Sequence, residues 1–232
     1  MSTLLVLGAK PEPVLPPTGA FDAVACANAS GQSAARLGLP TPVFTVMSAI
    51  LTDGSAAGRM RLLALRGLET ERLYYYPRPA KAGSVVKRAV HAARNRRLRP
   101  PVLRRALAEV GYRYGELVLR SAEDYRRLIN ELCGPDVALQ VARKQASSGA
   151  LAVVLGVADP RFNRVVVSGF SFELTQAAGL DPEIARRGTD VSRHRDSDIA
   201  VLRALAERHG VCTTEPVVHQ AAGVPLFSDP RC

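Results

Sequence analysis

A short run of β-branched residues between two helical stretches is the feature that most restricts how this chain can fold. Arg164–Phe172 contains three consecutive valines and ends in glycine and small polar residues, which is typical of a buried strand. Before it, Ala150–Gly156 is an apolar helical run, and after it Ile199–Ala206 carries apolar residues at helical spacing. A last strand is expected at Val211–Thr214. This alternation of helix and strand predicts a parallel sheet covered by helices.

The first half of the chain carries further strand signals. Thr3–Leu7 is apolar and is followed by glycine, and the next candidates are Phe21–Cys26, Pro42–Val46 and Leu73–Tyr76. The turn after Thr3–Leu7 lacks the GxGxxG fingerprint, which argues against a dinucleotide site there. We therefore predict one Rossmann-like α/β domain over residues 1–232, with a mostly parallel sheet.

Helical signals also occur in the middle of the chain. Val102–Val110 has helical spacing, and Ser121 has the character of an amino-terminal cap for a helix that ends at Gly134-Pro135. The tail from Glu215 to Cys232 is rich in proline and glycine. We expect that tail to be irregular and to pack over the sheet.

The net charge of +10 is concentrated in one segment. Residues 78–127 contain fourteen Lys or Arg and four Asp or Glu, and the rest of the chain is neutral. Prolines and a lack of periodicity predict a loop or loosely held basic insertion at about 77–127. Such a segment attracts the phosphates of nucleic acid, anionic lipid or an acidic glycan. Nucleic acid is disfavoured, because no aromatic residue lies among the basic residues 81–105.

Cysteine spacing and hydropathy indicate in which cellular compartment the protein is expected. The four cysteines, Cys26, Cys133, Cys212 and Cys232, lack CxxC spacing, which argues against a zinc site and against a secreted disulfide framework. No apolar run approaches the roughly 18 residues of a membrane span, and no signal peptide is apparent. We expect a cytoplasmic protein, with the amphipathic stretch Val102–Leu107 resting on the inner membrane face.

Short motifs recur in a fixed order along the chain. They are Gly8 through Pro11, Asn28, Ser147-Ser148-Gly149, Val167-Ser168-Gly169-Phe170-Ser171-Phe172, His194, Asp198-Ile199, Thr214-Glu215-Pro216 and Gly223-Val224-Pro225-Leu226. In this order the chain resembles the bacterial sialyltransferases of glycosyltransferase family 42. The resemblance implies a variant of the glycosyltransferase A fold. It also implies inverting, metal-independent transfer of sialic acid or a related acidic sugar from a CMP-activated donor, with no other cofactor, to a glycan or glycolipid acceptor.

The resemblance implies roles for residues at these motifs. His194 would be the catalytic base, because imidazole titrates near neutrality. Ser147, Ser148 and Gly149 begin a helix whose free amides suit an anion, here the donor's carboxylate, and the same turn is also an ordinary serine cap. The remaining donor-binding positions are Gly8, Asn28, Gly169, Phe170 and Ser171. Without the family pattern, a surface histidine and a loop asparagine are the plainer interpretations of His194 and Asn28.

The chain also departs from the family pattern. Ser171 and Glu173 replace an aspartate and a tyrosine, and residues 172–194 contain no tyrosine to contact the leaving phosphate. A carboxylate at Glu173 would repel that phosphate unless it points away. The candidate substitutes as phosphate ligands are Arg186, Arg187, Arg193 and Arg195. Asp196 and Asp198 would orient the imidazole or cap the following helix, and capping is the favoured interpretation.

Two other functions fit parts of the sequence. The Ser-Ser-Gly-Ala turn also resembles the Rossmann-like group of pterin diphosphokinases and flagellin-modifying glycosyltransferases, which explains the region of His194 poorly. A basic protein with a degenerate site that binds nucleic acid through residues 77–127 is the other alternative.

Overall fold

Seven parallel strands form one sheet in the computed structural model, which describes residues 2–48, 56–76, 99–173, 191–228 and 232. The strands are β1 (Thr3–Leu7), β2 (Ala23–Ala27), β3 (Phe44–Ser48), β4 (Glu69–Tyr76), β5 (Arg113–Leu119), β6 (Arg164–Ser168) and β7 (Val211–Thr213). Their order is β5-β4-β3-β2-β1-β6-β7, and each of the six neighbouring pairs is parallel. The predicted parallel sheet is therefore confirmed.

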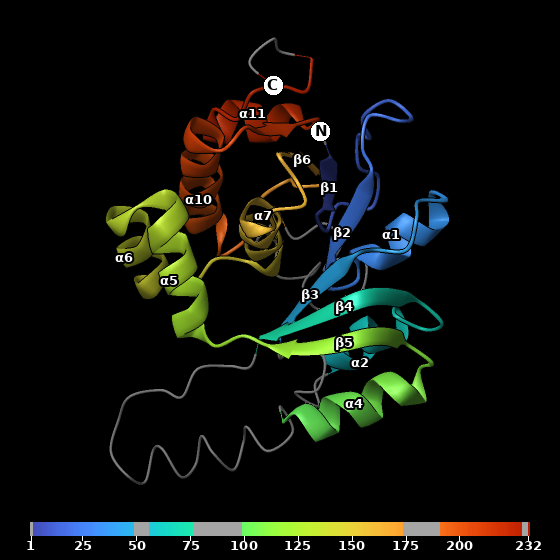
Figure 1. Cartoon of the computed structure of the whole chain (residues 1–232). Helices are drawn as coiled ribbons and strands as arrows, with labels where there is room; N and C mark the ends of the chain where they lie inside the picture. The colour runs from blue at the N-terminus through green and yellow to red at the C-terminus, as the bar shows by residue number, and fades with distance from the viewer. Residues whose placement is uncertain (1, 49–55, 77–98, 174–190, 229–231) are drawn as a thin grey trace, which may run out of the picture.

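Helices cover both faces of the sheet (Figure 1). They are α1 (Ser30–Arg36), α2 (Ala56–Leu63), α4 (Pro100–Glu109), α5 (Ala122–Cys133), α6 (Pro135–Arg143), α7 (Ser148–Ala158), α10 (Arg195–Arg208) and α11 (Pro216–Ala222). One face is covered by α7, which packs on β1, β2, β3 and β6 and is itself flanked by α5 and α10. The opposite face carries α1 beside β1 and β2.

The core occupies both faces of β1, which explains why that strand is apolar throughout. Leu4 and Val6 belong to the cluster around α7, whereas Leu5 and Leu7 pack on the side of α1. The helix α7 approaches β1 closely at Gly156, where a Cβ atom would lie 2.6 Å from Leu4 Cδ2. A larger residue at Gly156 would push α7, and the site residues at its start, away from the sheet.

The basic region is more regular than the predicted loop or loosely held insertion. The helical signals at Val102–Val110 and after Ser121 are confirmed, and only the strand β5 was not indicated by the sequence. Within the predicted insertion, residues 100–127 supply α4, the edge strand β5 and the start of α5, while residues 77–98 lie outside the described chain. Leu103 and Leu107 of α4 are buried against the sheet, so the apolar side of the predicted membrane-facing stretch is used internally. Among the described helices, none is long and apolar enough to cross a bilayer.

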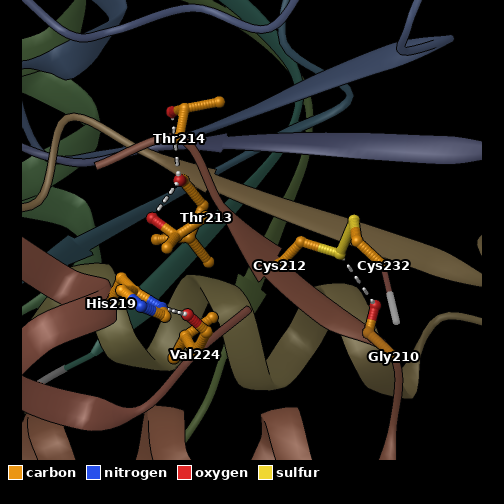
Figure 2. The surroundings of a disulfide bond; sticks show 8 residues. Gly210, Cys212, Thr213, Thr214, His219, Val224 and Cys232 are labelled. Carbon is orange, nitrogen blue, oxygen red and sulfur yellow. Dashed lines mark hydrogen bonds between the residues drawn. A yellow bond between two sulfur atoms is a disulfide. The ribbon is translucent and has the colours of Figure 1, made fainter. Parts of the chain in front are cut away.

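The carboxyl-terminal half differs from the predictions in three places. The valine-rich strand ends at Ser168, short of Phe172, because Gly169 and Phe172 have φ values of +72° and 57° that leave the extended region. The tail contains α11 and is not irregular throughout. Cys212 and Cys232 form a disulfide, contrary to the expectation drawn from cysteine spacing, and it joins the last residue to β7 (Figure 2).

Candidate active site

The candidate site lies where the strand order reverses. Strands β2 to β5 follow one another on one side of β1, and β6 and β7 lie on the other. Ligands of such sheets bind at this switch point, beyond the carboxyl ends of the strands. Gly8, Asn28 and Gly169 directly follow β1, β2 and β6, so three of the predicted donor-binding residues lie at this edge.

Closely packed glycines form the floor of the site. Gly8 N donates to Ser168 O over 2.8 Å, and a Cβ atom at Gly8 would lie 2.4 Å from Gly169 O. The Phe170 ring fills the space between the strand ends and α7, because a Cβ atom at Gly149 would lie 2.9 Å from its Cε1. Gly8 therefore lies against Gly169 and Phe170, and the Phe170 ring connects them to Gly149 at the start of α7.

The start of α7 provides backbone donors that have no acceptor within the helix. Ser147 is the amino-terminal cap, and its Oγ accepts from Ala150 N at 3.2 Å. Ser148 and Gly149 are the first two helical residues, whose N–H groups have no acceptor within a helix. With the helix dipole, these N–H groups make a site suited to an anion.

His194 lies beside the segment that leads into α7. Its Nδ1 lies 2.5 Å from Gln145 O, and because a carbonyl oxygen only accepts, Nδ1 carries the proton. The lone pair is therefore on Nε2, which accepts from Arg193 Nε at 3.0 Å. Burial lowers the pKa of His194 below its ordinary value, and the charges of Arg193 and Lys144 lower it further, against the opposing effect of the Gln145 bond. At neutral pH the imidazole is thus an uncharged base.

The two aspartates after His194 fasten this segment to the start of α7. Asp198 Oδ1 accepts from Ser147 N at 2.8 Å, and Asp196 Oδ2 pairs with Lys144 Nζ at 2.6 Å. The sequence interpretation was wrong on both: Asp198 binds a different helix from its own, and neither carboxylate contacts the imidazole. Burial raises the pKa of Asp198 to about 7, while the bonds from Ser147 oppose that rise.

Asn28 has a fixed orientation at the end of β2. Its φ of 51° is a left-handed conformation that asparagine tolerates better than most residues. Its backbone N donates to Val46 O at 2.8 Å, and its Oδ1 accepts from Ser48 N at 3.1 Å. Because Oδ1 is held in this way, the Nδ2 group is the part of the side chain left to donate to a ligand.

Glu215 is a central residue of the site that the sequence did not reveal. It is 1% exposed, and its Oε1 accepts from Gly169 N and Val14 N, both at 2.9 Å. Its Oε2 pairs with Lys10 Nζ at 2.7 Å. One carboxylate therefore joins the turns after β1, β6 and β7. The only sequence signal was its place in the Thr-Glu-Pro motif, and that motif carries no sign of burial.

The remaining predicted residues are less closely tied to this centre. Ser171 is half-buried, and its Oγ accepts from Glu173 N at 3.3 Å, while Glu173 itself is exposed. Arg195 is exposed at the start of α10. Arg186 and Arg187 lie outside the described residues. Within the described chain, no cluster of three His, Cys, Asp or Glu has the geometry to hold a metal.

Comparison with known proteins identifies the fold alone. No protein-family model matches the chain, and no curated protein matches its sequence. A variant of the sialyltransferase CST-II in complex with CMP covers 100% of this chain and 88% of its own, with 13% identity and a TM-score of 0.57. The Campylobacter jejuni CstII structure with the substrate analogue CMP-3FNeuAc covers 97% and 85%, with 14% identity and a TM-score of 0.53.

A third structure, CST-II with a trisaccharide acceptor and CMP, covers 96% of this chain and 86% of its own, with 13% identity and a TM-score of 0.51. The predicted fold class, a Rossmann-like parallel sheet of the variant glycosyltransferase A type, is confirmed by these likenesses. At this level of identity they assign no role to any residue.

Proposed function

We propose that this protein is an inverting glycosyltransferase that moves a sialic acid or a related acidic sugar from a CMP-activated donor to a glycan hydroxyl. The observation that carries the proposal is the pair of bonds from His194 to Gln145 and from Ser147 to Asp198, which hold a neutral imidazole beside the start of α7. The likeness to structures solved with CMP and with CMP-3FNeuAc supports the choice of donor.

The reaction would be a single displacement with His194 as the base. An acceptor hydroxyl oxygen bonds to the anomeric carbon while its proton passes to His194 Nε2. The bond from that carbon to the phosphate oxygen breaks, and its electron pair leaves with CMP. Attack opposite the leaving group inverts the anomeric centre. An uncharged imidazole suits this task because it accepts the proton at neutral pH.

The donor's charges would be met by separate groups. The N–H groups of Ser148 and Gly149 would bind the sugar carboxylate, and Asn28 Nδ2 would donate to the nucleotide or the sugar. The Arg193 guanidinium would exchange its hydrogen bond to His194 Nε2 for one to the leaving phosphate. The lone pair of Nε2 would then be free to accept the proton. Arg195, one residue beyond His194, would be a second phosphate ligand.

The acceptor would be a glycan or glycolipid reached from the cytoplasmic side. Arg104 and Arg105 of α4 are exposed, so contact with anionic lipid would be electrostatic, with the leucines of α4 remaining in the core. Sedimentation with vesicles containing phosphatidylserine, at low and at high salt, tests this contact.

Nucleotide selectivity tests the proposed donor. Melting temperatures would be measured with CMP, CDP, UDP and GDP, each with and without magnesium, because a ligand of the native state raises the melting temperature by mass action. We expect stabilisation by CMP that does not require magnesium, and the same stabilisation in His194→Gln, which keeps the donor contacts. Preferential stabilisation by GDP with magnesium would instead favour a relationship to the pterin diphosphokinases.

A further inference from the structure

Three buried side-chain atoms have no hydrogen-bond partner within the described chain: Arg120 Nε, Tyr125 OH and Gln145 Nε2. Buried polar groups in folded proteins are nearly always paired, so each exception calls for an explanation. Arg120 directly follows β5, Tyr125 lies in the first turn of α5, and Gln145 leads into α7. All three therefore lie at the edge of the sheet where the strands end. Gln145 belongs to the candidate active site, whereas Arg120 and Tyr125 form a separate group at the ends of β4 and β5.

Arg120 lies beside the phenol ring of Tyr74. Its backbone N donates to Tyr75 O at 3.1 Å, and its guanidinium carbon lies 5.9 Å from the centre of the Tyr74 ring. The Tyr125 and Tyr76 rings meet edge to face with centroids 5.4 Å apart. Arg120 directly follows β5 and Tyr125 lies in the first turn of α5, so the two residues are close along the chain. Burial raises the pKa of Tyr125, and the charge of Arg120 acts in the opposite direction.

This arginine has no counter-charge among the described residues, although it is half-buried. The carboxylates nearest to it in sequence are all engaged elsewhere. Glu123 pairs with Arg126 at 2.5 Å and Glu116 with Arg72 at 2.6 Å, while Asp124 accepts from Ser121 N and Oγ at 2.8 and 2.7 Å and from Arg127 at 2.9 Å. A partly buried cation without an anion, beside a buried hydroxyl without a partner, destabilises a fold. Buried polar groups that lack a partner are found mainly at functional sites, where a bound ligand supplies the missing partner.

The chemistry of the group indicates the kind of ligand. A guanidinium binds a carboxylate or phosphate through paired hydrogen bonds, and the phenol of Tyr125 adds a further donor. The half-buried ring of Tyr74 offers an apolar surface next to that charge, whereas the Tyr76 ring is buried against Tyr125. An anionic sugar has both an acidic group and a ring that packs against such a surface.

We propose that Arg120, Tyr125 and Tyr74 form a second subsite, which binds an anionic sugar of the glycan acceptor. The inference rests on the proposed transferase function. Neighbouring strands lie about 4.8 Å apart, so Arg120 at β5 is about 14 Å from Asn28 at β2. An oligosaccharide would then run along the carboxyl ends of the strands, whose arrangement Figure 1 shows, with its reacting hydroxyl at His194 and its acidic sugar at Arg120.

Binding measurements without donor test this subsite. The probes are 3′-sialyllactose, galactose 6-phosphate and neutral lactose, titrated calorimetrically into the wild type, Arg120→Gln and Tyr125→Phe. We expect at least one charged probe to bind more tightly than lactose. Arg120→Gln should weaken that binding tenfold or more and Tyr125→Phe severalfold, while CMP affinity stays within twofold. Arg66→Gln, which removes an exposed arginine in the turn after α2, is the matched control for loss of charge.

Stability provides a second readout that separates ligand binding from a structural role. Because Arg120 Nε and Tyr125 OH have no hydrogen-bond partner among the described residues, both variants should unfold at the same urea concentration as the wild type or at a higher one. Marked destabilisation of both variants would overturn the subsite. The subsite would also be overturned if the protein binds CMP but binds the charged probes no more tightly than lactose. If the protein binds a charged probe through Arg120 but does not bind CMP, the subsite would be supported and the proposed reaction would be rejected.

Discussion

Removal of the Glu215 carboxylate should weaken the fold at the centre of the site. In Glu215→Ala, the buried Gly169 N–H loses its acceptor, and Lys10 and Val14 lose theirs. Breaking a buried ion pair typically destabilises by about 3–5 kcal/mol. The lower end applies, about 3 kcal/mol, because Lys10 is 32% exposed and Val14 is 47% exposed, so both can regain water.

The glutamine variant separates the hydrogen bonds from the charge. Both backbone donors bind the same oxygen, Oε1, so the amide oxygen of Glu215→Gln can keep both bonds while the ion pair is lost. We expect a loss of about 1–2 kcal/mol for this variant, since a hydrogen bond to a neutral acceptor is weaker than one to a carboxylate.

Urea unfolding followed by circular dichroism measures these differences through the shift in midpoint. Glu131→Ala is the matched control, because Glu131 is exposed on α5, and we expect its effect to stay within about 0.5 kcal/mol. The reasoning would be refuted by an alanine variant that loses less than about 1 kcal/mol, or by equal losses in the alanine and glutamine variants.

Three further predictions concern pH and the disulfide. In the folded protein Asp198 has a pKa of about 7, whereas in the unfolded chain its pKa is near 3.8. Between these two pH values only the folded state binds the proton, so the free energy of unfolding falls by up to ~1.4 kcal/mol for each unit that the pH rises. Asp198→Asn should remove that fall in urea midpoints measured from pH 4 to pH 7.5, and an unchanged slope would contradict it. Transfer activity should decline as the pH falls below the pKa of His194, which lies under 6.5, because the base then becomes protonated. Arg193→Gln should move this decline to higher pH, because it removes a charge that lowers the pKa of His194. A static pH profile in that variant would count against His194 as the base. Cys232→Ser opens a loop with a sequence separation of 20 and should lose about 3 kcal/mol, while dithiothreitol should lower the midpoint of the wild type and leave the variant unaffected.

Local patterns in the sequence were enough to predict the elements that carry the site. The valines of β6 and the serine cap of α7 are recognisable because burial on both faces and capping depend on neighbouring residues. The strand β5 was missed because it lies at the sheet edge, where exposed Arg113 and Glu116 obscure the apolar pattern.

The contacts that assemble the site could not be predicted, because they join distant parts of the chain. The bond from Ser147 to Asp198 spans 51 residues, and the pair of Lys10 with Glu215 spans 205. A glutamate or aspartate carries no local sign that it will be buried against a backbone N–H group. The disulfide was missed for a similar reason, since Cys212 and Cys232 become neighbours only when the tail returns to β7.

The most direct test of the proposed reaction is the rate of sugar transfer from CMP-sialic acid to a lactose-based acceptor, measured together with CMP affinity, in the wild type and in His194→Gln. We predict transfer by the wild type, loss of at least a hundredfold in rate in His194→Gln, and CMP affinity unchanged within about twofold, since removal of a general base typically costs 10²–10⁴ in rate. Equal rates in the two proteins, or a wild type that binds CMP no better than GMP, would contradict the assignment of His194 and the α7 turn to one active site.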